Sequence, residues 1–167
     1  MTAIGTSGID DVAEAAIKGG LNMAIWQFQC NIIPTRLNID RLSRDEMISW
    51  KGISQPPHEL KFLEQEKSWS RDIVQYGKSD ETCIEFMYSD NVLDEISCRL
   101  DLRSFTKTNL ISLIEYVQEI GAMFLVGDMV YLPKIEDMLE IMKKSRANRF
   151  CKNPVEYILS QNEKIEV

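Results

Sequence analysis

The stretch TCIEFMYSDNVLDEISCRLDL, residues 82–102, decides the fold. In its second half the apolar residues Ile96, Cys98, Leu100 and Leu102 alternate with polar ones. The polar positions are Glu95, Ser97, Arg99, Asp101 and Arg103, joined across the preceding turn by Glu85. This alternation predicts a β-strand with one buried face and one solvated face, because successive side chains of a strand point to opposite sides.

The register of this strand with its predecessor can also be predicted. A two-residue turn at Asp90-Asn91 would place Glu85 opposite Ile96 and so mix the two faces. A loop longer by one residue pairs Phe86 with Ile96 and Ile84 with Cys98, which keeps apolar opposite apolar. We expect the second register. It puts Cys83 and Cys98 on opposite faces and argues against a disulfide between them.

Patterns on either side extend the strand pair into a whole domain. Residues 72–76 complete a three-stranded meander, and an earlier strand over 26–32 ends at Pro34. Further elements are expected as follows: a helix from Ser43 with a capping box at Glu46, a helix opened by Pro57, a helix over 110–120 between a Thr cap and Gly121, strands over 122–126 and 129–132, a helix from Pro133, a basic loop over 143–152, and a short helix from Pro154.

The order of these elements predicts an α+β fold: a mostly antiparallel sheet with a central three-strand meander and helices packed on one face. At the N-terminus, Ile9, Val12, Ala13, Ala16 and Ile17 share one helical face. We therefore expect a flexible segment with a short helix over residues 1–20, and a single domain over residues 21–167.

Composition favours some partners over others. The chain of 167 residues has 19 Lys and Arg against 26 Asp and Glu, a net charge of −7. This charge disfavours nucleic acid and anionic membranes as partners and suits a basic protein. No apolar run approaches a membrane span, and the N-terminus lacks the basic and apolar parts of a secretory signal, so we expect a cytoplasmic protein.

Motifs of catalysis are missing from the sequence. His58 is the single histidine, and the four cysteines form no CxxC pair. Neither GxSxG nor a phosphate-binding glycine loop occurs. We therefore predict no catalytic site, no metal site and no cofactor.

Two groups of residues are candidates for binding. A basic cluster could hold an anion, although cations at a helix C-terminus also stabilise the helix dipole. Its members are Lys143, Lys144, Arg146 and Arg149. A second group could contact a partner, since Trp and Arg are common interface anchors and acidic side chains attract a basic surface. Its members are Trp50, Trp69, Asp90, Asp94, Glu95, Arg99 and Asp101. The alternative for this group is a buried tryptophan core and an ordinary solvated sheet face.

Three segments carry a resemblance to known proteins. They are Ser68-Trp69-Ser70, the strand 96–103 and the run 145–154, SRANRFCKNP. These segments resemble small bacterial α+β proteins of uncharacterised function, some of which are similar to immunity proteins that neutralise a toxin domain. The resemblance implies a binding role without catalysis. Our hypothesis is a protein-binding module that occludes a basic toxin; a small enzyme and a structural or oligomeric protein are the alternatives, and the oligomeric state stays open.

Overall fold

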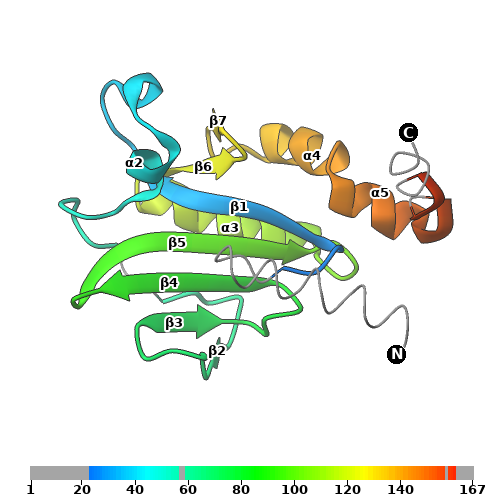
Figure 1. The fold of residues 1–167 in the computed structure, drawn as a ribbon, viewed down its shortest axis with the longest axis horizontal. Helices are drawn as coiled ribbons and strands as arrows, with labels where there is room; N and C mark the ends of the chain where they lie inside the picture. The colour runs from blue at the N-terminus through cyan, green and yellow to red at the C-terminus, as the bar shows by residue number, and fades with distance from the viewer. Residues whose placement is uncertain (1–22, 57–58, 157, 161–167) are drawn as a thin grey trace.

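The computed structural model describes residues 23–56, 59–156 and 158–160. The segment predicted over residues 1–20 lies outside this range. The described strands form one seven-stranded sheet in the order β2-β3-β4-β5-β1-β6-β7, and every neighbouring pair is antiparallel. Together with the helices this sheet makes the α+β fold that the sequence predicts (Figure 1).

The predicted meander is present as β3 (Ile73–Tyr76), β4 (Cys83–Ser89) and β5 (Val92–Asp101). Phe86 pairs with Ile96 and Ile84 with Cys98, as predicted. The predicted reason for this register was wrong, because the loop is not lengthened. Asp90 and Asn91 form a two-residue turn with φ of 52° and 64°, and the register shifts instead between Met87 and Tyr88. A tight turn with two positive φ angles suits the strand twist, so a β-bulge absorbs the extra residue.

An interior strand of the sheet is β1 (Gln27–Pro34), which lies between β5 and β6 (Ala122–Val126). The sheet edges are short: β2 (Gln65–Glu66) on one side and β7 (Met129–Tyr131) on the other. Seven of the eight residues of β1 are buried. Both faces of the sheet centre are therefore inside the protein.

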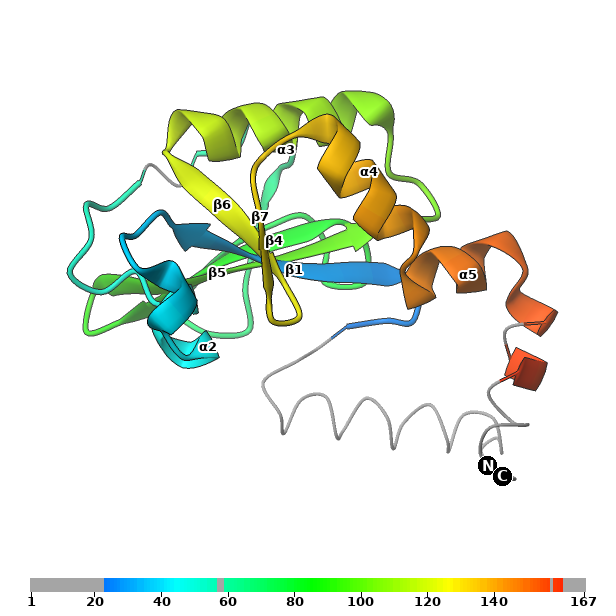
Figure 2. The ribbon, with the colours of Figure 1, turned by 90° about the horizontal axis from the view of Figure 1, so that it is seen from above.

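Helices cover the sheet unequally. Figure 2 shows α3 (Lys107–Glu119) and α4 (Ile135–Lys143) on one face, where they close the main core. The short α2 (Arg44–Ile48) lies on the opposite face and packs Met47 into a smaller cluster with Ile33. The predicted capping box of α2 is present: Ser43 accepts from the Glu46 amide, and the Glu46 side chain accepts from the Ser43 amide. A 3₁₀ turn, η1 (Ile39–Arg41), precedes it.

Two predicted elements differ from the structure. Residues 59–64 form no helix, and the start predicted at Pro57 lies outside the described residues. The expected basic loop is largely the helix α5 (Arg146–Lys152). The missed signal is Ser145, whose hydroxyl accepts from the Asn148 amide at 3.1 Å and caps this helix.

The core depends on Phe86, which is fully buried on β4 and lies edge-to-face with Tyr76 and Tyr116 at centroid distances of 6.2 and 6.5 Å. We predict that Phe86→Ala lowers the free energy of unfolding by roughly 3–5 kcal/mol, because it empties an aromatic core site. Leu37→Ala is the matched control, since Leu37 is 92% exposed and should change stability by less than about 0.5 kcal/mol. Urea unfolding of the two variants checks the prediction. Equal effects would contradict it.

Candidate functional site

The polar face of the meander is largely buried, so the expectation of a solvated face is wrong for most of it; Glu95 is half-buried and only Arg103, after the end of β5, is exposed. Glu85 and Arg99 are 3% and 4% exposed. Arg99 Nη1 donates to Glu85 Oε1 at 2.7 Å, and Nη2 donates to Cys83 Sγ at 3.2 Å. The opposite charges and the hydrogen bonds compensate for the lost hydration of these side chains. A strand that alternates apolar and charged residues can therefore be buried on both faces. Arg99 is therefore not a surface contact residue.

Asp101 is also occupied within the chain. It is 2% exposed and accepts from Arg103 Nε and Nη2 at 2.9 Å each. Burial alone would raise the pKa of Asp101, but the hydrogen bonds from Arg103 outweigh it and hold the pKa below its usual value. The guanidinium of Arg103 in turn lies 3.9 Å from the ring centroid of Trp26. Asp101 orders this corner of the sheet instead of facing a partner.

The remaining acidic candidates lie near the β4–β5 turn. Asp90 is exposed at the turn itself. Asp94 accepts from Ser49 Oγ at 3.3 Å, and Glu95 accepts from Asn31 Nδ2 at 3.1 Å. Burial raises the pKa of Glu95, although the hydrogen bond from Asn31 opposes this. Of the acidic candidates only Asp90 is exposed; Asp94 and Glu95 are half-buried.

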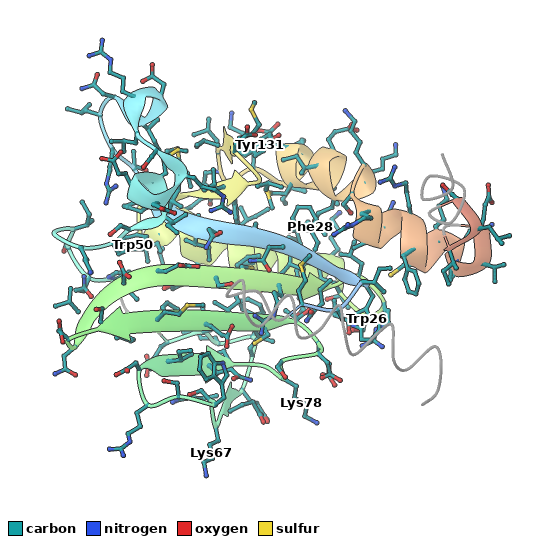
Figure 3. The ribbon with its side chains drawn as sticks, in the orientation of Figure 1. Trp26, Phe28, Trp50, Lys67, Lys78 and Tyr131 are labelled. Carbon is teal, nitrogen blue, oxygen red and sulfur yellow. The ribbon has the colours of Figure 1, made fainter. Side chains whose placement is uncertain are left out.

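The two candidate tryptophans differ in exposure. Trp50 is 2% exposed and belongs to the core, where its Nε1 donates to the Ile32 carbonyl at 2.9 Å. Because the single indole donor is satisfied, the side chain is stable inside the protein. Figure 3 shows Trp50 and Trp26 at opposite ends of β1. Trp69 is 77% exposed in the loop between β2 and β3 and stays a candidate contact residue.

The basic cluster is spread over two helix ends. Lys143 and Lys144 lie at the end of α4, and Arg146 and Arg149 belong to α5. All four are exposed, and Lys144 Nζ lies 3.9 Å from Glu140 Oε2. Lys143 and Arg149 are in the last turns of their helices, where positive charge interacts favourably with the dipole. Helix stabilisation is a sufficient reason for these two residues.

An acidic groove that the sequence analysis missed lies between α3 and residues 59–62. Its volume is about 600 Å³. Its lining residues are Glu59, Leu60, Lys61, Phe62, Ser112, Glu115, Tyr116, Gln118 and Glu119. The carboxylates of Glu59, Glu115 and Glu119 are exposed, and Leu60 and Tyr116 are buried. The groove therefore has an apolar and aromatic floor and an acidic rim.

The rim carries an excess of negative charge. In the described part of the chain no salt bridge involves its three glutamates, and Lys61 is the one cation among its lining residues. The negative charge of the rim also affects a nearby tyrosine. Burial is the main cause that raises the pKa of Tyr76, and the charge of Glu59 adds to it. Burial also raises the pKa of Tyr116, with a smaller contribution from Glu119. The groove is suited to a cationic group.

One signal in the sequence marks the acidic end of α3 as unusual, although it does not locate the groove. Glu119 is the last residue of α3, where negative charge is unfavourable to the helix dipole. Glu115 lies four residues earlier, so the two like charges also repel across one turn. Their partner Glu59 is remote in the sequence, and the groove itself could not be predicted.

The described residues offer no metal site, membrane span or activated thiol. They contain no group of three His, Cys, Asp or Glu side chains that could hold a metal ion, and no helix long and apolar enough to cross a membrane. All four cysteines are free. Burial is the main cause that raises the pKa of Cys83 to about 12, so this thiol is a poor nucleophile at neutral pH.

No protein-family model, no curated protein and no solved structure matches this chain. A functional proposal therefore depends on the chemistry of the surface.

The buried ion pair gives a test of the polar face. We predict that Arg99→Met lowers the free energy of unfolding by roughly 3–5 kcal/mol, because it leaves Glu85 buried without its cation. The double variant Arg99→Met/Glu85→Leu should recover most of this loss, since two apolar side chains need no partner. Arg71→Met, at an exposed arginine, is the control. Urea unfolding measures all four proteins, and a double variant no more stable than the single one would overturn the assignment.

Proposed function

We propose that the chain is a non-enzymatic, cytoplasmic protein-binding module that captures a basic partner. An immunity protein that neutralises a toxin by occluding it is the form of this function that we favour. The acidic groove between α3 and residues 59–62 is the observation that carries the proposal.

The groove offers a cationic side chain two kinds of contact. The carboxylates of Glu59, Glu115 and Glu119 can pair with an ammonium or guanidinium group. The floor of Leu60, Phe62 and Tyr116 can pack against the aliphatic stem of lysine or arginine. An anchor that combines burial with charge is typical of interface residues that dominate affinity.

The energetics of α3 also favour a binding role for its acidic residues. Glu119 at the helix C-terminus and Glu115 one turn before it each reduce the stability of an isolated helix. Side chains that break a local rule in this way are expected at functional sites.

Charge outside the groove supports the same kind of partner. The net charge of −7 would speed encounter with a basic surface over distances of about 8 Å at physiological ionic strength. The exposed Asp90 adds to this field, and Trp69 is available as a further contact.

A reducing compartment suits the cysteines. Cys30, Cys83 and Cys98 are buried free thiols, and Cys151 is a half-buried one. Unpaired cysteines are common in cytosolic proteins, whereas secreted domains tend to pair them. This supports the cytoplasm as the place of action.

The test begins with partners captured from the native host by the intact chain. We predict a partner with a basic surface, whose association rate falls as salt rises. The variant Glu59→Lys/Glu119→Lys should slow association by about tenfold or more, because it reverses two of the three rim charges. Stability should not fall, because a lysine at position 119 lies favourably at the helix C-terminus and four residues after Glu115. Stopped-flow association and thermal unfolding measure the two effects separately.

Asp40→Lys/Asp128→Lys is the matched control. It makes the same change in net charge at two exposed carboxylates that do not line the groove. If both double variants slow association equally, net charge and not the groove attracts the partner. Capture of no protein, together with turnover of a small molecule, would reject the function itself.

A further inference from the structure

Helix α4 separates its charges along its length. The acidic residues Glu136, Asp137 and Glu140 occupy the first two turns, and Lys143 and Lys144 follow at its end. This order agrees with the helix dipole, so charge alone requires no partner. The helix dipole does not account for the apolar residue that this helix exposes.

An apolar side chain is exposed at the centre of α4. The helix runs from Ile135 to Lys143, and its middle residue, Leu139, is 48% exposed. Met138 and Met142 are buried against the core, so Leu139 is not needed there. Leu132, just before the helix, is 51% exposed. Leu139 is therefore an exposed apolar side chain on a helix whose other apolar residues pack with the core.

Glu136, Leu139 and Lys143 lie on one side of the helix, because residues three, four and seven apart are neighbours on a helical surface. All three are exposed. Within the described residues neither Glu136 nor Lys143 takes part in a salt bridge. We call these three residues the α4 stripe. Its apolar member is flanked by an acid on the N-terminal side and a base on the C-terminal side.

We propose that the α4 stripe is the contact surface for a second copy of this chain, with the two α4 helices antiparallel about a twofold axis near Leu139. The midpoint between Glu136 and Lys143 falls at Leu139–Glu140 in the sequence. An antiparallel pair centred there brings Glu136 of each copy opposite Lys143 of the other, and the two Leu139 side chains meet beside the axis.

A twofold contact needs a surface that is complementary to itself. The α4 stripe meets this requirement, because reversing its direction about the Leu139–Glu140 midpoint exchanges an acid for a base and moves the leucine by only one position. A single helix pair buries little area compared with the 1,200–2,000 Å² or so of a stable interface. The dimer is therefore expected to be weak and to form at micromolar concentrations.

Charge exchange between the two positions tests the pairing. Glu136→Lys places lysine at both positions, and Lys143→Glu places glutamate at both, so each variant alone should repel itself. We predict that each raises the dissociation constant of the dimer by about tenfold or more. The two variants mixed in equal amounts should form a heterodimer of native strength, because every contact then joins opposite charges. The doubly exchanged Glu136→Lys/Lys143→Glu should also dimerise.

Sedimentation equilibrium of the full chain measures these constants, with the native dimer expected at twice the 19.3 kDa of the chain. Asp137→Lys is the matched control. It removes an acid from the same helical turn but lies on another side of α4, where it lines a groove with Phe28. This variant should lose the same helix-dipole stabilisation and still dimerise.

Three results would overturn the proposal: a native chain that stays monomeric at high micromolar concentration, a dimer that the single charge variants leave unchanged, and a mixture of the two variants that stays monomeric. Circular dichroism of each variant checks that the total helix content is unchanged. The acidic groove uses other residues, so this inference and the proposed function can fail separately.

Discussion

The structure depends on burying both faces of its two central strands. β1 is buried at seven of its eight positions, and β5 is buried at its last six. One face of this pair is apolar, but the other consists of amide, hydroxyl and charged side chains. These side chains need partners inside the protein, since a buried polar group without one costs free energy. Gln27 donates to the carbonyls of Ser79 and Glu81, and Arg99 donates to Glu85. The pairing is not complete: among the described residues, Arg99 Nε is buried and has no hydrogen-bond partner.

This requirement shows which part of the fold the sequence could predict. Alternation along residues 82–102 determines which side chains share a face, and it correctly paired Phe86 with Ile96. It does not reveal whether the polar face meets water, because a solvated face and a satisfied buried face have the same period. The turn shows a similar limit. Asp90 and Asn91 tolerate positive φ, so the chain closes tightly there and places its extra residue in a bulge. Either solution gives the same register, and the pattern cannot separate them.

The candidate site was harder to predict than the fold, because it depends on contacts between distant residues. Trp50 was a reasonable interface candidate at a helix end. Its indole, however, donates to the carbonyl of Ile32, 18 positions earlier on β1, and the side chain is buried in the core. Arg99 and Asp101 were candidates for the same reason and are buried by their pairing with Glu85 and Arg103. The acidic groove brings residues 59–62 against α3, which lies far along the sequence, and no local sequence pattern predicts this contact.

The helix dipole accounts for the charges of one proposed contact surface, the α4 stripe, but not for those of the other, the acidic groove beside α3. On α4 the acids lead and the bases follow, which is the favourable order, so helix stability accounts for its charges without any partner. The case for a contact on α4 therefore depends on Leu139 and on the symmetry of the charges around it. On α3 the order is unfavourable, with Glu119 at the negative end of the dipole and no basic residue in the last turn. Helix stability cannot explain this charge, and neither can a salt bridge among the described residues. A cationic partner would give this charge a role, and that is why we base the functional proposal on the acidic groove and not on the larger number of charges elsewhere.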